Sequence, residues 1–408
     1  MSSTESKKRK LIFLWTYTDW GGAQLYMLTI MRLAAQLWDV VVVLPMATKK
    51  DVLAFYEPYD LPIEFLNHHF DAKVETSVAG KVRRQFQRIR SEITAYRHLR
   101  KFDLRESILH IEIAPWQSWV LLCLLCFRGG NVFTTLNNFP PDAPKWRKLV
   151  WKTRLQILSR LPRFHIFASN RYVKDSLREW LTPQYWDSVP IAYSPIDSSQ
   201  IAESRESNVD LASIRRKFDL VEEDFVILAV GQFVDRKGRW VFLEAAKKVL
   251  EQAPNSRFVW LMPSPLTEED RVKVESYLLF DRFVPVISQD VGKDRVSIFN
   301  FFRIADAFAL PSYIEGLPIA LLEAMALGVP SISTNVYAIP EAIMPDKTGI
   351  LIEPGDSTAL AEAILRIKSD ARLRERLSRD GSQFAIENFD GRIMASTYLE
   401  AYRKCFDS

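Results

Sequence analysis

Short apolar runs alternate with longer amphipathic stretches along almost the whole chain. The runs are rich in Val, Ile, Leu and Phe, as expected for strands buried on both faces of a parallel sheet. In the first half they predict strands at 11–16, 40–44, 63–66, 108–112, 132–135 and 165–168, and helices at 23–36, 82–100, 117–127, 146–161 and 173–181. Strands that alternate with helices favour the α/β fold class.

The same alternation begins again in the second half. It predicts a helix at 240–252, three closing helices, and strands at 225–230, 258–262, 283–286, 307–310, 331–333 and 349–352. Residues 196–210 are polar and weakly patterned, which predicts a linker. Because 408 residues exceed one ordinary core, we predict a first domain over 1–195, a second over 211–388 and a final helix over 389–408.

Composition is ordinary for a soluble enzyme, but charge is divided unevenly. Hydrophobic residues make up 48% and charged residues 25% of the chain. The net charge is +4. Residues 1–195 hold 28 Lys and Arg and 17 Asp and Glu, whereas the remainder holds 26 Lys and Arg and 33 Asp and Glu. A first half with a balance of +11 suggests an anionic partner such as a membrane surface.

Cysteine usage and apolar run lengths predict a cytoplasmic protein. Three cysteines form no disulfide framework, and Cys123 and Cys126 lie in an apolar run as packed core thiols would. The first apolar run, 11–15, is too short for a signal peptide core. The longest, 119–127, falls well short of the ~20 residues of a spanning helix, so we expect no transmembrane anchor.

Residues 311–330 place two carboxylates around a helix start. Glu315 precedes the start and Glu323 lies about one turn inside the helix. Gly316 interrupts regular structure, and Pro318 suits a first helical turn. Unpaired N–H groups near Leu317 would form an anion site at the carboxyl edge of a sheet. A nucleotide sugar, with a diphosphate between two hydroxyl-rich rings, would suit this arrangement.

The pattern P-S-x-x-E-G-L-P-x-x-x-L-E-A-M-A-x-G-x-P in this segment resembles the donor-binding segment of the retaining glycosyltransferase family 4. The resemblance implies a GT-B fold, with two Rossmann-like domains that face each other across a cleft and a final helix that packs back on the first domain. It implies that Glu315 holds sugar hydroxyls and Glu323 ribose hydroxyls. Gly316, Leu317 and Pro318 would belong to the donor site.

Residues 230–238 resemble the family's G-R-L-x-x-x-K-G, whose Arg and Lys bind the donor diphosphate. Lys237 matches the lysine, whereas Gln232 occupies the arginine position. Glutamine donates a hydrogen bond without charge, so some stabilisation of the leaving diphosphate is lost. Arg236 either compensates for this loss or points to solvent.

Gly21 and Gly22 lie between the first strand and the first helix. Paired glycines let the backbone approach a ligand closely. The segment is not a G-x-G-x-x-G fingerprint, so a nicotinamide cofactor is not indicated. In family 4 a similar loop lies beside the donor phosphate and the acceptor.

The acceptor side is less defined in the sequence. Asn137 stands where family members carry a histidine, and asparagine cannot ionise near neutral pH. His110 is the nearest substitute, although a histidine on a buried strand is more often structural. The chain has no Asp-x-Asp motif, which suits the metal-independent chemistry of GT-B enzymes. We expect no metal and no cofactor besides the nucleotide-sugar donor.

Two basic stretches stand out in the first half. Residues 81–105 contain nine Lys and Arg against two acids, and residues 145–163 contain seven and no acid. Apolar residues recur near helical spacing in the second stretch, at Trp146, Leu149, Val150, Ile157 and Leu161. They form either a core-facing stripe or a surface that docks on anionic lipid at the inner face of the membrane. No recognition motif supports nucleic acid binding.

The sequence therefore predicts a retaining, metal-independent glycosyltransferase of hexosyltransferase type. It would transfer a sugar from a nucleotide-diphosphate donor to a glycan or lipid-linked acceptor, in cell-surface polysaccharide or glycolipid synthesis. Gln232 and Asn137 leave open a non-catalytic GT-B protein that binds a sugar or a partner. A GT-B epimerase that acts on the nucleotide sugar itself is the third possibility.

Overall fold

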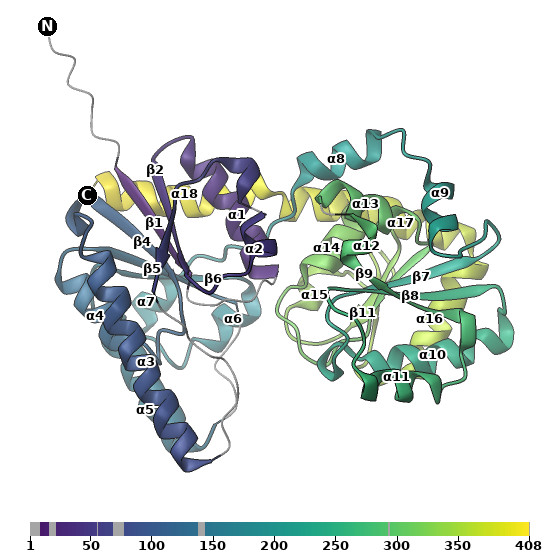
Figure 1. Cartoon of the computed structure of the whole chain (residues 1–408), viewed down its shortest axis with the longest axis horizontal. Coiled ribbons are helices and arrows are strands. Elements are labelled where there is room, and N and C mark those ends of the chain that lie inside the picture. The colour runs from purple at the N-terminus through teal and green to yellow at the C-terminus, as the bar shows by residue number, and fades with distance from the viewer. Residues whose placement is uncertain are drawn as a thin grey trace, which may run out of the picture. The chain divides into compact units, whose positions relative to one another are not determined.

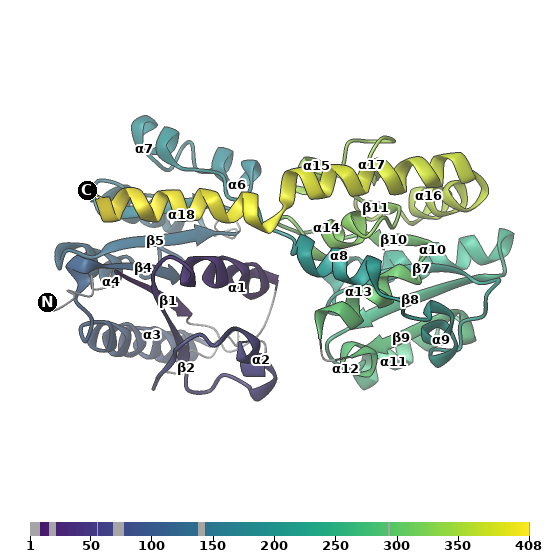
Figure 2. The ribbon, with the colours of Figure 1, turned by 90° about the horizontal axis from the view of Figure 1, so that it is seen from above.

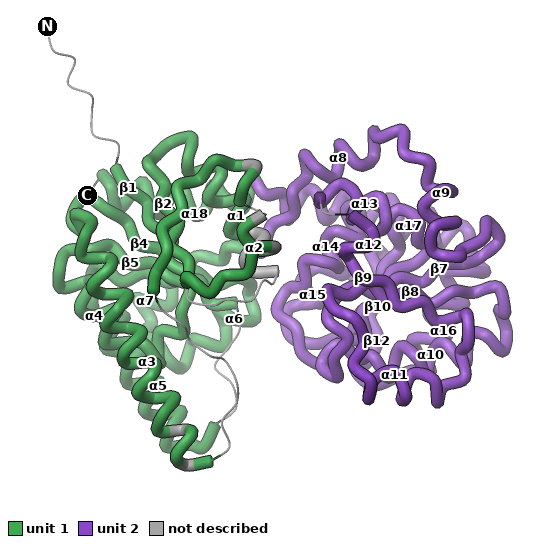
Figure 3. The backbone as a smooth tube through the Cα atoms, viewed as in Figure 1, with its two compact units in different colours: residues 1–193, 392–408 green, residues 194–391 purple. Residues whose placement is uncertain are grey.

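The computed structural model describes residues 9–15, 22–54, 56–67, 77–137, 143–292 and 294–407. The chain forms two compact units (Figure 3). The first unit comprises residues 1–193 and 392–408, and the second comprises residues 194–391.

Six parallel strands form the sheet of the first unit, in the order β3-β2-β1-β4-β5-β6. Strands β1, β2, β4, β5 and β6 are labelled in Figure 1. The strands are β1 Lys10–Trp15, β2 Asp39–Pro45, β3 Ile63–Leu66, β4 Ser107–Glu112, β5 Asn131–Leu136 and β6 Phe164–Ala168. Its helices are α1 Gly22–Ala35, α2 Lys50–Ala54, α3 Val78–Leu99, α4 Trp119–Phe127, α5 Lys145–Leu158, α6 Arg171–Ser176, α7 Pro183–Ser188 and α18 Gly391–Asp407. Each strand predicted in this half is present, within one or two residues of its predicted ends.

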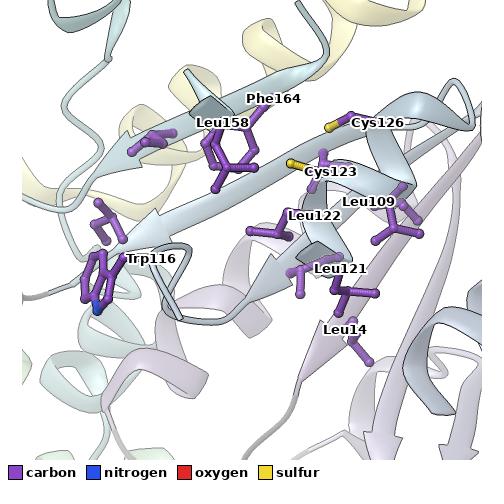
Figure 4. Packing of buried hydrophobic residues seen from close by; sticks show 14 of the residues in the cluster. Leu14, Leu109, Trp116, Leu121, Leu122, Cys123, Cys126, Leu158 and Phe164 are labelled. Atoms are coloured by element: carbon purple, nitrogen blue, oxygen red, sulfur yellow. The ribbon is translucent and has the colours of Figure 1, made fainter. Parts of the chain in front are cut away.

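One face of this sheet packs against α4 and α5. Leu14 and Leu109 from the strands meet Leu122 of α4 and Leu158 of α5 in one apolar cluster (Figure 4). Cys123 and Cys126 of α4 belong to the same cluster, and burial raises the pKa of the Cys126 thiol to about 12. The two cysteines are therefore packed core thiols.

The final helix α18 lies along the first unit (Figure 2). Tyr402 and Tyr398 of this helix are fully buried against aromatic rings of the sheet. The ring of Tyr402 is edge-on to that of Phe133, with 5.0 Å between the ring centroids, and the centroids of Tyr398 and Phe167 are 4.3 Å apart. The hydroxyl of Tyr402 lies 2.5 Å from Nδ1 of His110 on β4. Burial raises the pKa of Tyr402, so this hydroxyl keeps its proton.

The other ring nitrogen of His110 is also engaged. Nε2 lies 3.0 Å from a carboxylate oxygen of Glu112 and 3.0 Å from the hydroxyl of Thr135. When the proton of His110 is on Nε2, this nitrogen donates a hydrogen bond to Glu112, and Nδ1 accepts one from the hydroxyl of Tyr402. His110 thus fixes α18 to the centre of the sheet.

We predict that Tyr402→Phe lowers the free energy of unfolding by about 1–3 kcal/mol, because it leaves one buried nitrogen of His110 without its partner. Urea unfolding measures this change. Tyr313→Phe, at a residue that is 43% exposed, is the control and is expected to have little effect. Equal stability of Tyr402→Phe and the parent protein would show that the hydroxyl does not hold the helix.

Six parallel strands also form the sheet of the second unit, in the order β12-β11-β10-β7-β8-β9. The strands are β7 Phe225–Val230, β8 Ser256–Met262, β9 Phe283–Ile287, β10 Ala307–Leu310, β11 Ser331–Thr334 and β12 Ile350–Ile352. Its helices are α8 Ser198–Glu206, α9 Leu211–Lys217, α10 Arg239–Gln252, α11 Glu268–Glu275, α12 Ser288–Val291, α13 Arg295–Arg303, α14 Ile319–Ala326, α15 Ile339–Ala342, α16 Ser357–Ser369 and α17 Ala371–Phe389. Taken in chain order within each unit, both sheets have the Rossmann order 3-2-1-4-5-6.

The segment predicted as a linker, 196–210, is part of the second unit and carries helix α8. Asp197 caps this helix by accepting from the N–H of Gln200. Ile201 is buried, and the hydroxyl of Ser204 donates to Asn300 of α13 at 2.8 Å. The sequence did not predict this helix because only Ile201 and Ser204 of α8 are buried, which is too few positions to give an apolar pattern.

Candidate functional site

Two loops meet at the carboxyl ends of β7 and β10, which are paired neighbours at the centre of the second sheet. The chain order of the strands reverses between these two. Ligands of open parallel sheets bind outside the carboxyl ends of the strands at such a switch point. One loop leads into α10 and the other into α14.

The two loops are fixed to each other by a close backbone contact. Gly238 has φ +72°, and a Cβ at this position would lie 1.8 Å from the carbonyl oxygen of Pro311. Only glycine fits there. The N–H of Tyr313 donates to the carbonyl of Arg236 at 2.8 Å, which joins the loops a second time.

Lys237 and Glu315, from different loops, form an ion pair at this junction. Their side chains are only 12% and 9% exposed. The hydroxyl of Ser312 donates to the same carboxylate oxygen at 3.0 Å. The structure therefore brings together the lysine and the glutamate that the two sequence motifs singled out separately.

Helix α14 begins at Ile319, shortly after Glu315 in the chain. Gly316 leads to Leu317 and Pro318, which are both buried and fix the entry into the helix. Pro318 is the N-cap, and no side chain caps this helix start within the described chain. The N–H groups of Leu321 and Leu322 donate to the carbonyl of Pro318. The helix offers no carbonyl to the N–H groups of Ile319 and Ala320, so this end of α14 is the positive end that suits an anion.

Glu323 is buried inside α14 and forms an ion pair with Arg295, the first residue of α13. Burial raises the pKa of Glu323; Arg295 opposes this shift and the charge of Asp197 adds to it. Sequence reasoning missed Arg295. It belongs to no motif, and its only local signal is the preceding helix cap, Asp294.

The remaining predicted donor residues are less enclosed. Gln232 and Arg236 are both exposed, which fits the alternative that Arg236 points to solvent. Gly21 lies outside the described residues, and only the backbone of Gly22, at the start of α1, is described.

The two acceptor-side candidates differ in their surroundings. Asn137 directly follows β5 and is half-buried at the carboxyl edge of the first sheet. His110 is fully buried, with both ring nitrogens engaged inside the first unit. This arrangement favours the structural role that the sequence left open for His110.

Neither a metal centre nor a membrane span is found in the described part of the chain. Among these residues, no group of three or more His, Cys, Asp or Glu could hold a metal ion. None of the described helices combines the length and apolar character needed to cross a membrane.

A chain with two Rossmann-like units of this strand order has the GT-B fold. Over 98% of both chains, the structure superimposes on a glycosyltransferase from Rickettsia africae with a TM-score of 0.76 and 16% identity. Residues 211–384 match the family model described as glycosyl transferases group 1. The match covers the predicted donor-site residues of the second unit.

Two relatives match over similar lengths. The capsular polysaccharide biosynthesis glycosyltransferase CapM of Staphylococcus aureus is 29% identical over 43% of this chain and 45% of its own length. An Escherichia coli UDP-Gal:alpha-D-GlcNAc-diphosphoundecaprenol alpha-1,3-galactosyltransferase is 27% identical over 44% of this chain and 46% of its own length. The chain thus spans less than half the length of these curated relatives.

The raised pKa of Glu323 predicts a pH dependence of stability. Above pH 4.5, the ordinary pKa of the group, the folded protein retains a proton that the unfolded chain releases. The free energy of unfolding contributed by this group therefore falls as the pH rises toward the folded pKa. Urea unfolding at several pH values should show this fall in the parent protein and not in Glu323→Gln. If the parent protein instead gains stability relative to Glu323→Gln over this range, the ion pair with Arg295 outweighs burial.

Proposed function

We propose that this protein is a retaining glycosyltransferase that moves a sugar from a nucleotide-diphosphate donor to a glycan or lipid-linked acceptor. The observation that carries the proposal is the pairing of Lys237 with Glu315 at the switch point, beside the uncapped start of α14. The names of the two relatives, which concern capsular polysaccharide and a lipid diphosphate, support a role in cell-surface polysaccharide or glycolipid synthesis.

The donor diphosphate takes the place of Glu315 at the ammonium of Lys237. Glu315 then accepts hydrogen bonds from hydroxyls of the sugar, and Glu323 accepts them from the ribose. The positive end of α14 and Lys237 stabilise the negative charge that develops on the leaving diphosphate. Gln232 contributes a hydrogen bond without charge to the same group.

The transfer itself takes place on one face of the sugar. The acceptor oxygen bonds to the anomeric carbon on the side from which the diphosphate departs, so the anomeric configuration is retained. A phosphate oxygen of the leaving group takes the proton of the acceptor hydroxyl. The protein contributes positioning and charge stabilisation, and this scheme assigns no step to a metal ion or a protein nucleophile.

We expect Lys237→Ala and Glu315→Ala each to lower turnover by a factor on the order of 10²–10³, because each removes a group aimed at the transferring sugar or its leaving group. Release of free nucleotide from a panel of nucleotide sugars, with added acceptor extract, measures this loss. Lys247→Ala and Glu362→Ala are matched controls at exposed positions of α10 and α16 and should retain full activity.

The same assay separates the alternatives. A protein that binds nucleotide sugars but never releases nucleotide is the non-catalytic GT-B protein. Conversion of the donor sugar to an epimer without any acceptor identifies the epimerase. Either result would contradict sugar transfer.

We further infer that α3 and α5 dock the first unit on anionic lipid. Most of the predicted apolar stripe lies outside the core: Trp146 and Leu149 are each 64% exposed, whereas Leu161 packs against the core cluster. A different set, Trp151, Leu155 and Leu158, faces the core. The exposed side chains of Trp146, Leu149, Val150 and Ile157 are therefore available to a bilayer.

Helix α3 is drawn next to α5 in Figure 1, and Arg88 of α3 interacts with the charge of Arg154 of α5. Phe86 is 69% exposed. Burial lowers the pKa of the Arg88 guanidinium, and its ion pair with Glu92 opposes this shift. The nearby charges of Arg154 of α5 and Arg84 lower this pKa further. Residues 82–91 and 145–154 hold nine Lys and Arg and no acid. Exposed Trp and Phe among cations suit the headgroup region of anionic lipid, where a lipid-linked acceptor would be presented.

Cosedimentation with vesicles tests this surface. We expect binding to vesicles rich in anionic lipid and little binding to neutral vesicles. Reversal of Arg147, Lys148 and Lys152 to Glu should abolish it, because each cation contributes about 1 kcal/mol near such a membrane. Reversal of Lys247, Arg271 and Arg379, which are exposed in the second unit, is the control. Unchanged cosedimentation of the first variant would contradict lipid docking.

A further inference from the structure

A cavity of about 610 Å³ opens in the first unit, and four arginines line it. Each arginine precedes a strand: Arg9 lies before β1, Arg105 before β4, Arg128 before β5 and Arg163 before β6. These strands are consecutive neighbours in the sheet, so their starts lie side by side at its amino-terminal edge. We call this cavity the arginine cup.

Three of the arginines are held by specific contacts. Gly129 has φ +91°, and a Cβ there would lie 2.8 Å from Cγ of Arg105, so the turn packs directly against the stem of this arginine. The carbonyl of Gly129 accepts from Nη1 of Arg163 at 3.1 Å. Arg9 stacks over the ring of Phe406, 5.3 Å from its centroid, and lies 3.5 Å from the carboxylate of Asp407.

The cup contains more positive charge than its acids balance. Glu106 is the acid in its lining, and Asp407 contacts Arg9 at its edge. Four guanidinium groups against these two carboxylates leave an excess of two positive charges. Like charges held together favour the binding of an anion.

We propose that the arginine cup binds a phosphate-bearing small molecule. The planar fork of arginine pairs with two phosphate oxygens at once, and a volume of about 610 Å³ is within the range of small-molecule sites. Phe127, which is 76% exposed, and Phe406 give the cup an apolar wall for the organic part of the ligand.

The cup is separate from the position proposed for the acceptor. It belongs to the first unit and lies at the amino-terminal edge of that sheet, whereas Asn137 follows the carboxyl end of β5. The strands between the two edges are about 20 Å long. A ligand in the cup therefore does not occupy the position proposed for the acceptor.

A bound ligand would also hold the end of α18. Cys405 and Phe406, from the last turn of this helix, line the cup together with the starts of the strands. An anion that bridges Arg9 and the arginines of the central strands would tie this turn to the sheet. Ligand binding to the folded state alone raises stability, so the first unit should unfold at a higher temperature with ligand.

Isothermal titration calorimetry of the full chain with inorganic pyrophosphate and with inorganic phosphate tests the proposal. We expect pyrophosphate to bind and the double variant Arg105→Gln with Arg128→Gln to weaken its affinity at least tenfold. Arg97→Gln with Arg100→Gln, at exposed positions in the last turn of α3 and directly after it, is the control and should bind as the parent protein does. Arg105→Lys with Arg128→Lys keeps the charge without the fork and should give an intermediate loss.

Pyrophosphate could also bind at Lys237, so the same titration is repeated with Lys237→Ala. Binding that persists in Lys237→Ala and is lost in the arginine double variant supports the cup. Binding that is lost only in Lys237→Ala assigns pyrophosphate to the donor site and overturns the proposal. The absence of any pyrophosphate binding to the parent protein also overturns it. Circular dichroism shows whether each variant is folded before titration.

Discussion

The contact between Gly238 and Pro311 is the constraint on which the proposed donor site depends. A side chain at residue 238 would collide with the carbonyl of Pro311, so the loops after β7 and β10 approach this closely only because the residue is glycine. The approach places Lys237 against Glu315. Both side chains are largely shielded from water, so their charges act more strongly than exposed charges would.

The first unit has the same strand order as the second, but its basic residues gather at two places on its surface. Its sheet is covered on one side by α4 and α5 and packs through His110 and the aromatic rings against α18. The outer side of α5 is apolar and basic, and the amino-terminal edge of the sheet gathers four arginines. The basic balance of residues 1–195 is therefore concentrated at two distinct places with different proposed ligands.

Much of the proposed donor site was predictable because its residues lie close together in the chain. The segment that holds Glu315, Pro318 and Glu323 is continuous, and the loop with Lys237 follows a recognisable strand. The pairing of Lys237 with Glu315 was not predictable, since it depends on β7 and β10 being neighbours. Arg295 was missed for the same reason, because it reaches Glu323 from another helix.

The sequence by itself determined the alternation of strands and helices, the division into two halves and the class of ligand that the glycine- and proline-bounded motifs suggest. These features depend on local periodicity and on backbone conformations that particular residues allow. Only the tertiary structure decided that the apolar stripe of α5 faces outward, that α8 joins the second unit and that four distant arginines share one cavity. Each of these depends on the order of strands in a sheet or on which face of a helix is covered, and hydrophobic pattern alone leaves both open.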